Sequence, residues 1–211
     1  MKSILIITSL ILNIAVFGQT QSNKIPCNYK LLGLNKLTNV KAIKNKEDFN
    51  YYLVIKSKSK TDSICFDHDQ NNWSVDTCII NSKQLDGKGK PELIITCTKT
   101  SQEFSQSSDG YSVVQIWNLD TKTLMFKGSI SWNSSSEEIV KDTCFDCWET
   151  HTVAHICDGY YDIDFDDKGH LIIKNLIVHV INSEFCKSDH EEGLYELVNG
   201  IYILTTKTNG K

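Results

Sequence analysis

Two β-hairpins are predicted in succession over residues 73–132, and they constrain the fold more than any other feature of the chain. The turn of the first hairpin contains the dipeptide Asp86-Gly87, and the turn of the second lies at residues 119–122. Aspartate followed by glycine is a strong turn signal, because glycine adopts positive φ angles without steric cost. The flanking segments are rich in β-branched and aromatic residues, which favour strands. These residues therefore predict an antiparallel meander.

Further strand-like segments extend this pattern over most of the chain. The dipeptide Asn199-Gly200 favours a type I′ turn, which joins two short strands near the C-terminus. No segment predicts a long helix, and residues 99–110 and 133–136 read as surface loops. Single helical turns are the alternative for residues 38–50 and 134–142. The additional predicted strands occupy residues 49–57, 150–156, 160–165, 170–181, 194–198 and 201–204. The sequence thus predicts an all-β fold, an antiparallel meander of about nine or ten strands that is propeller-blade-like or sandwich-like.

The first residues have the pattern of an export signal. Lys2 precedes an apolar run at residues 4–17, and the residues before position 19 offer small-residue spacing for cleavage. The apolar run is too short to span a membrane comfortably. We therefore expect a signal peptide at residues 1–18, a secreted or periplasmic mature protein, and no membrane insertion after cleavage.

The mature chain is long enough for one domain with its own core, because about 190 residues remain after the signal peptide. Residues 19–36 are expected to form an N-terminal arm or a short first strand. Residues 37–211 are expected to form a single β-rich domain. A finer division into blade-like halves would place them at residues 49–132 and 148–206.

The chain contains eight cysteines, and an even set in an exported protein favours disulfides over metal or redox chemistry. A hairpin with its tip at Gly87-Lys88 would place Cys78 opposite Cys97. Opposed residues have Cβ atoms about 4.5–5.5 Å apart, which is close to the span of a disulfide. A bridge between these two cysteines is therefore expected. Two free, buried cysteines in a longer hairpin with a shifted register are the alternative.

Residues 144–157 hold the densest group of metal-capable side chains in the chain. Zinc bound by Cys144 and Cys147 would need two further ligands, from Cys157 or from the two histidines of the segment. On a strand those histidines would lie about 13 Å apart, so they could not hold the same ion. We therefore expect a disulfide between Cys144 and Cys147, or separate bridges to Cys157 and Cys186, in preference to zinc.

The charged residues argue against a nucleic-acid partner. All basic residues are lysines, and the 26 acidic residues outnumber the 22 basic ones to give a formal net charge of −4. Phosphate and base-edge recognition favour the bidentate guanidinium group of arginine, and nucleic-acid-binding domains usually carry a surplus of positive charge. We expect no nucleic acid among the partners.

The run at residues 85–95, Leu-Asp-Gly-Lys-Gly-Lys-Pro-Glu-Leu-Ile-Ile, is followed by the strand-like residues 113–119 and a return strand. This stretch resembles a single repeat of the integrin-type FG-GAP and VCBS β-propeller proteins, and the resemblance covers residues 73–132. It implies a β-blade architecture and an extracytoplasmic binding role. In those families carboxylates of the hairpin loop bind calcium, and the corresponding residues here are Gln84, Asp86 and Lys88. Because lysine repels a cation, we expect this loop to bind no metal.

Three aspartates elsewhere are candidate calcium ligands. Asp162, Asp164 and Asp166 alternate along a predicted strand, so they point to one face of it. Residues two apart lie about 7 Å apart along a strand, which is too far to share one ion unless the chain curls. A solvated strand face that ends in a turn is the alternative. Apart from calcium at these residues, no cofactor is expected.

The sequence contains no motif of nucleophilic catalysis, phosphate binding or zinc proteolysis. Two polar excursions, residues 99–110 and 133–147, instead carry aromatic side chains at or near their ends. Aromatic anchors dominate the energetics of recognition surfaces. The candidate partner-binding residues are Phe104, Tyr111, Trp132 and Trp148.

These observations predict an exported binding or interaction module without catalytic activity. Its partner would be a protein or a glycan, in the cell envelope or outside the cell. A periplasmic inhibitor of a cell-wall hydrolase is an alternative, by resemblance to propeller-like inhibitors of peptidoglycan hydrolases. A metal-dependent hydrolase centred on residues 144–157 is a second alternative.

Overall fold

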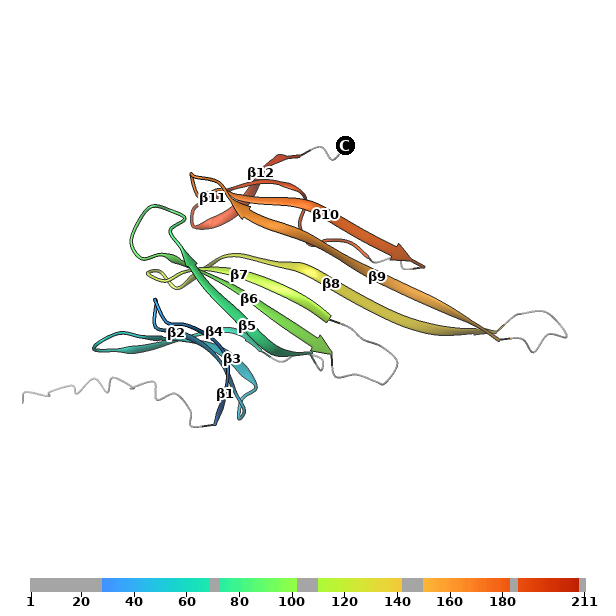
Figure 1. Cartoon of the computed structure of the whole chain (residues 1–211), viewed down its shortest axis with the longest axis horizontal. Helices are drawn as coiled ribbons and strands as arrows, with labels where there is room; N and C mark the ends of the chain where they lie inside the picture. The colour runs from blue at the N-terminus through green and yellow to red at the C-terminus, as the bar shows by residue number, and fades with distance from the viewer. Residues whose placement is uncertain (1–27, 69–72, 102–109, 142–149, 183–185, 209–211) are drawn as a thin grey trace, which may run out of the picture.

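The computed structural model describes residues 28–68, 73–101, 110–141, 150–182 and 186–208. The described residues form twelve β-strands in two antiparallel sheets and contain no helix (Figure 1). The predicted all-β antiparallel fold is confirmed, with twelve strands in place of about nine or ten. Because there is no helix, none of the described residues forms a helix long and apolar enough to cross a membrane. The expected signal peptide at residues 1–18 lies outside the described residues.

The first sheet contains four strands in chain order, and the sequence predicts two of them. A helical turn is the alternative prediction for residues 38–50, but residues 40–45 form a strand that is entered through a turn closed by an asparagine. The Asn35 side chain accepts hydrogen bonds from two backbone N–H groups of this turn, and Asn39 adopts a φ of 53°. Val40 and Ala42 then bury their side chains completely. The four strands are β1 (Tyr29–Asn35), β2 (Val40–Asn45), β3 (Asn50–Lys56) and β4 (Thr61–His68). Strand β1 lies within residues 19–36, for which a short first strand is the alternative to an arm.

The second sheet is an eight-stranded meander in which every strand pairs with its neighbours in sequence. Strand β12 also contacts β8, so the sheet curls back on itself. The boundary between the two sheets lies between residues 68 and 73, whereas the expected halves were residues 49–132 and 148–206. The strands are β5 (Trp73–Lys83), β6 (Glu92–Ser101), β7 (Gly110–Asn118), β8 (Thr123–Lys141), β9 (Thr150–Phe165), β10 (Leu171–Ile181), β11 (Gly193–Val198) and β12 (Ile201–Lys207).

The register of the β5–β6 hairpin is the predicted one, although its loop is longer than a two-residue turn. Cys78 lies opposite Cys97 and Ile80 opposite Ile95. The loop spans residues 84–91, which extend equally on both sides of the predicted tip. A symmetric extension leaves the pairing unchanged, because register depends on the centre of the loop and not on its length.

Strand β8 is longer than the sequence indicates. The sequence predicts a loop at residues 133–136, with a single helical turn over residues 134–142 as the alternative, but β8 continues through Lys141. Its second half pairs residue by residue with β9, from Ser131 opposite Tyr160 to Lys141 opposite Thr150. The backbone ladder overrides the weak strand preference of serine. The β8–β9 hairpin therefore extends well beyond the neighbouring strands (Figure 1).

Two hydrophobic cores hold the sheets. The first lies between the four-stranded sheet and strands β5–β6, and it contains Tyr51 and Leu53 from one side and Leu93 and Ile95 from the other. The second lies inside the curl of the eight-stranded sheet, under strands β7–β12, with Met125 fully buried within it. The two sheets are thus parts of one packed structure.

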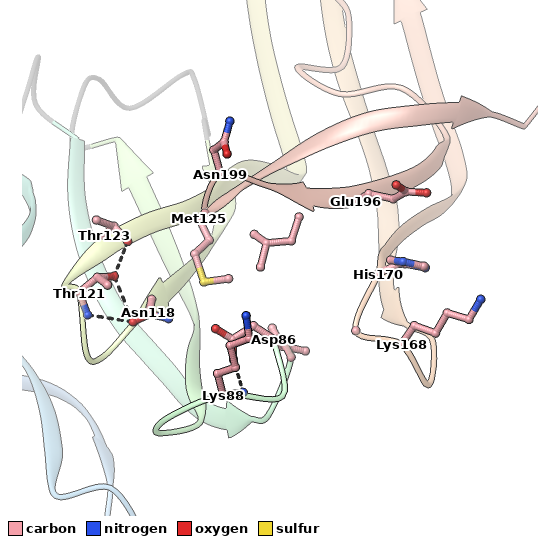
Figure 2. A pocket seen from close by; sticks show the side chains of 14 residues that line it. Asp86, Lys88, Asn118, Thr121, Thr123, Met125, Lys168, His170, Glu196 and Asn199 are labelled. Atoms are coloured by element: carbon pink, nitrogen blue, oxygen red, sulfur yellow. Dashed lines mark hydrogen bonds between the residues drawn. The ribbon is translucent and has the colours of Figure 1, made fainter.

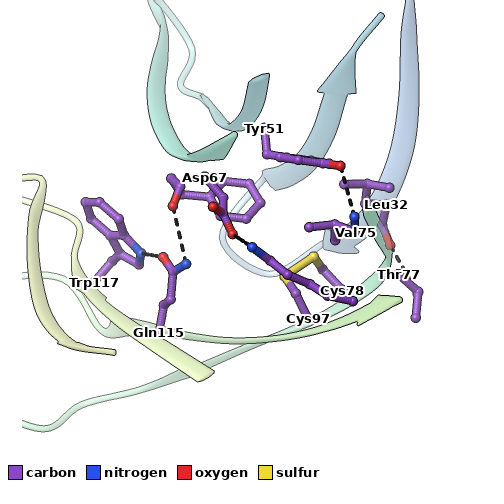
Figure 3. Close-up of a disulfide and its surroundings, with 11 residues drawn as sticks. Leu32, Tyr51, Asp67, Val75, Thr77, Cys78, Cys97, Gln115 and Trp117 are labelled. Carbon is purple, nitrogen blue, oxygen red and sulfur yellow. Dashed lines mark hydrogen bonds and ion pairs between the residues drawn. A yellow bond between two sulfur atoms is a disulfide. The ribbon is translucent and has the colours of Figure 1, made fainter. Parts of the chain in front are cut away.

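Polar contacts cross the joint between the two sheets (Figure 3). The hydroxyl oxygen of the fully buried Tyr51 accepts a 2.9 Å hydrogen bond from the Val75 backbone N–H. Asp67 on β4 forms an ion pair with Lys99 on β6, and their side chains are only 10% and 8% exposed. Breaking a buried ion pair of this kind leaves an uncompensated charge, so it fixes how the sheets meet.

Two disulfides are present among the described residues. The predicted Cys78–Cys97 bridge is confirmed, and both residues lie in the first core. Cys157 and Cys186 form the second bridge, which joins β9 to the segment before β11. Disulfides persist in oxidising environments outside the cytosol. Cys65 is an exposed free thiol, and Cys144 and Cys147 lie outside the described residues.

Candidate functional site

Tyr111 and Trp132, two of the predicted aromatic anchors, come together in the structure. They are direct cross-strand partners on β7 and β8. Both line a cavity of about 430 Å³, here called the aromatic cavity, together with Lys127 on β8 and residues of the segment before β11. The sequence identified each anchor separately, and the hairpin register brings them to one place. The other two predicted anchors, Phe104 and Trp148, lie outside the described residues.

The Tyr111 ring packs against Lys99, a residue that also connects the two sheets. The Lys99 ammonium lies 5.6 Å from the centre of the ring, within the range of a cation–π contact. The same ammonium is held by Asp67 on the first sheet. The ring is therefore positioned by a buried charge pair, which makes this part of the cavity rigid.

The Trp132 indole packs across the backbone of β9. Trp132 lies opposite Gly159, and a Cβ atom at Gly159 would overlap the indole ring. Glycine is therefore needed at this position for the ring to approach the strand. The indole N–H is buried and has no hydrogen-bond partner among the residues that the structure describes. A buried donor without an acceptor costs about 1–3 kcal/mol, so the position of this ring is set by packing.

Two lysines of the aromatic cavity are available as hydrogen-bond donors. Among the described residues, Lys127 and Lys187 make no ion pair. Asp189, by contrast, accepts hydrogen bonds from the Ser129 backbone N–H at 2.7 Å and the Tyr161 hydroxyl at 3.3 Å. Burial and the Asp189 charge raise the pKa of the Tyr161 hydroxyl, so it stays protonated and donates. The cavity thus offers cations beside aromatic surface.

A second, more polar cavity of about 610 Å³ lies at one end of the eight-stranded sheet (Figure 2). Its walls come from the β5–β6 loop and from the turns β7–β8, β9–β10 and β11–β12. Alternate turns of a meander lie at the same end of the sheet, and the contact of β12 with β8 brings them around one opening. The sequence predicts these turns individually but does not indicate that they converge. This turn-end cavity is lined by Asp86, Lys88, Asn118, Lys168, His170 and Glu196, among others.

Buried Glu92 holds two of these turns together. It is fully buried at the start of β6, and its carboxylate accepts a 2.8 Å hydrogen bond from the Leu85 backbone N–H. Its other oxygen accepts a 3.3 Å hydrogen bond from the Asn118 side-chain amide. Burial raises the pKa of Glu92. This residue therefore couples the β5–β6 loop to the β7–β8 turn.

In the loop that resembles a calcium-binding hairpin, the side-chain amide of Gln84 is hydrogen-bonded within the loop. The Gln84 Nε2 atom donates to the Asp86 carboxylate at 3.2 Å and to the Lys88 carbonyl oxygen at 2.9 Å. Asp86 also accepts a 2.8 Å hydrogen bond from the Lys88 backbone N–H. Oxygens that would face a cation in such a loop are here bonded to N–H donors.

Asp162, Asp164 and Asp166 do not converge on one point. Asp162 accepts a hydrogen bond from Asn175, and Asp164 pairs with Lys174 at 2.8 Å. Asp166 closes the β9–β10 turn instead, by accepting hydrogen bonds from the turn backbone. Each carboxylate has its own partner, so this geometry adds no support for calcium.

One candidate zinc ligand of residues 144–157 is engaged in a disulfide. The sulfur of Cys157 is bonded to Cys186, so it is not a thiolate ligand, and a ring nitrogen of His155 meets the Asn182 carbonyl oxygen. Among the described residues there is no group of three or more His, Cys, Asp or Glu side chains that could hold a metal ion.

Comparison with protein-family models, with curated proteins and with solved structures gives no match to this chain.

Proposed function

We propose that this protein is an exported binding module, without catalytic activity, that recognises a protein or glycan of the cell envelope or the extracellular space. The observation that supports this proposal is the aromatic cavity, where Tyr111 and Trp132 stand opposite each other on paired strands. Both rings are held by their surroundings, Tyr111 by Lys99 and Trp132 by close packing on Gly159. Rigid aromatic side chains lose little entropy on binding, which favours their use as anchors.

The chemistry of the cavity indicates which part of a partner would enter it. Lys127 and Lys187 offer positive charge, while the carboxylate of Asp189 is already engaged by two donors. An acceptor-rich, anionic group would complement the lysines, and a flat apolar surface or a sugar ring would complement the aromatic side chains. A partner with an acidic group beside such a surface therefore fits best.

Affinity capture with a matched pair of tyrosine variants tests this proposal. Immobilised protein is incubated with solubilised envelope proteins and glycans, and the retained material is identified by mass spectrometry and sugar analysis. Tyr111→Ser should lose the retained partner. Tyr160→Ser is the control, because Tyr160 is 47% exposed on β9 and does not line the cavity. Equal retention by the two variants would contradict the proposal.

Inhibition of a cell-wall hydrolase is a second candidate function, and the long β8–β9 hairpin favours it. This hairpin extends well beyond the neighbouring strands (Figure 1), a shape suited to entering the cleft of an enzyme. Its backbone is paired along the whole described length, so it would remain stiff on insertion. Lysis of cell-wall suspensions by peptidoglycan hydrolases, followed by turbidity, tests this function. Slower lysis in the presence of the protein would support it, and unchanged lysis by a panel of such enzymes would contradict it.

A further inference from the structure

We propose that the turn-end cavity is a separate binding site for a zwitterionic ligand, an amino acid or short peptide with a free ammonium and a free carboxylate group. The cavity measures about 610 Å³, within the range of small-molecule sites. It shares none of its lining residues with the aromatic cavity. The two sites can therefore be tested independently.

The walls of the turn-end cavity are fixed before any ligand arrives. The Asp166 carboxylate accepts 2.9 Å hydrogen bonds from the backbone N–H groups of Lys168 and His170, which closes the β9–β10 turn. The Tyr202 hydroxyl donates a 2.7 Å hydrogen bond to the Gly169 carbonyl oxygen. Gly169, with a φ of 81°, packs so closely on the Leu85 carbonyl that a Cβ atom would not fit. Such preorganisation lowers the entropy cost of binding.

Charges of both signs lie unpaired at one edge of this cavity. Lys168 and Glu196 both line the cavity, and Figure 2 shows them on the same side of it, with His170 between them. Neither Lys168 nor Glu196 makes an ion pair or side-chain hydrogen bond with any other described residue. The Nδ1 atom of His170 is bonded to Asp166 at 2.8 Å, which orients the ring and leaves Nε2 for a ligand.

These groups match the two ends of a zwitterion. A ligand carboxylate would be bound by Lys168, and a ligand ammonium by Glu196, through charge-assisted hydrogen bonds. Apolar side chains of Leu85, Met125 and Leu197 also line the cavity and would contact the hydrocarbon part of the ligand. A neutral sugar would leave the charges of the wall without partners, so it fits less well.

Methyl NMR with the dipeptide leucyl-leucine tests the proposal. The chain has two methionines, Met1 and Met125, so a ¹³C-methyl label on methionine reports on the cavity almost alone. Leucyl-leucine should shift the Met125 methyl signal in a saturable way. The same dipeptide with an acetylated N-terminus and an amidated C-terminus should not, because it lacks both charges. Equal shifts with the two compounds, or no shift with either at millimolar concentration, would overturn the proposal.

Charge-removing variants assign the contacts. Lys168→Gln and Glu196→Gln should each weaken leucyl-leucine binding about tenfold or more, the effect of losing one charge-assisted contact. Lys36→Gln and Glu47→Gln are the matched controls, because both residues are exposed on the first sheet, away from the cavity. Wild-type affinity in both cavity variants would overturn the assignment. All four positions are on turns or partly exposed strands, and melting temperatures check that each variant is folded.

Discussion

Removal of the Cys78–Cys97 disulfide is expected to cost more stability than removal of the Cys157–Cys186 disulfide, although the second closes the longer loop. The sequence separations are 19 and 29 residues. Loop-closure entropy in the unfolded chain alone gives about 3.2 kcal/mol for the first bridge and about 3.6 kcal/mol for the second. On entropy alone, the Cys157–Cys186 bridge would contribute slightly more.

Packing reverses this order. Cys78 and Cys97 are 5% and 4% exposed within the core between the sheets, whereas Cys157 and Cys186 are only partly buried. Replacing the buried pair by alanine removes two sulfur atoms from a packed core, and burial of an apolar group the size of a methylene contributes about 0.8 kcal/mol, to which a cavity term is added. The expected losses are therefore about 5 kcal/mol for C78A/C97A and about 3.5 kcal/mol for C157A/C186A.

Urea unfolding of the two double variants under non-reducing conditions, followed by tryptophan fluorescence, measures both values. A loss of about 5 kcal/mol can equal the whole stability of a domain, so a C78A/C97A variant that is unfolded without urea would agree with this order. A C157A/C186A variant that is equally or more destabilised would refute it. That result would mean that the first disulfide is not part of the core that joins the two sheets.

Three further perturbations have defined outcomes. Tyr51→Phe leaves the Val75 backbone N–H without its acceptor and should lower the unfolding free energy by about 1–3 kcal/mol; unchanged urea unfolding would contradict this. Burial raises the pKa of Glu92, so the folded state holds that proton more tightly than the unfolded chain does. The stabilising contribution of Glu92 is therefore complete below its unfolded pKa and is lost as the pH rises through the folded pKa. The unfolding free energy of wild type minus that of Glu92→Gln, measured with urea, should be higher at pH 4 than at pH 7. A difference that stays constant between the two pH values would contradict this. Millimolar calcium should leave the melting temperature unchanged, because the three aspartates of residues 162–166 have separate partners; a rise of several degrees would show that they bind the ion.

Turn chemistry explains why much of the second sheet could be predicted. Asp86-Gly87 and Asn199-Gly200 mark hairpins through the backbone freedom of glycine, and both connect strands as expected. The opposition of Cys78 and Cys97 followed from the centre of the first loop. These features depend on residues close together in the chain, where the sequence signal is strongest.

The elements that escaped prediction depend on partners distant in sequence. The serine-rich half of β8 has no marked apolar alternation, and it is a strand because β9 pairs with it. Val40 and Ala42 on β2 are buried by a core shared with the other sheet, which local patterns do not reveal. The turn-end cavity likewise arises from four turns that only the curl of the sheet brings together. For the aromatic cavity, Tyr111 and Trp132 could be predicted from the sequence as binding residues, but the lysines around them could not.

Site-specific photo-crosslinking tests most directly whether the aromatic cavity is the surface through which this protein binds its partner. A photoreactive amino acid is placed at position 127, where Lys127 lines the cavity, and at position 36 as a control, where Lys36 is exposed on the first sheet. After illumination with envelope extract, the binding proposal predicts a discrete adduct of higher mass at position 127 and none at position 36. The absence of an adduct at position 127, or equal labelling at both positions, would contradict it.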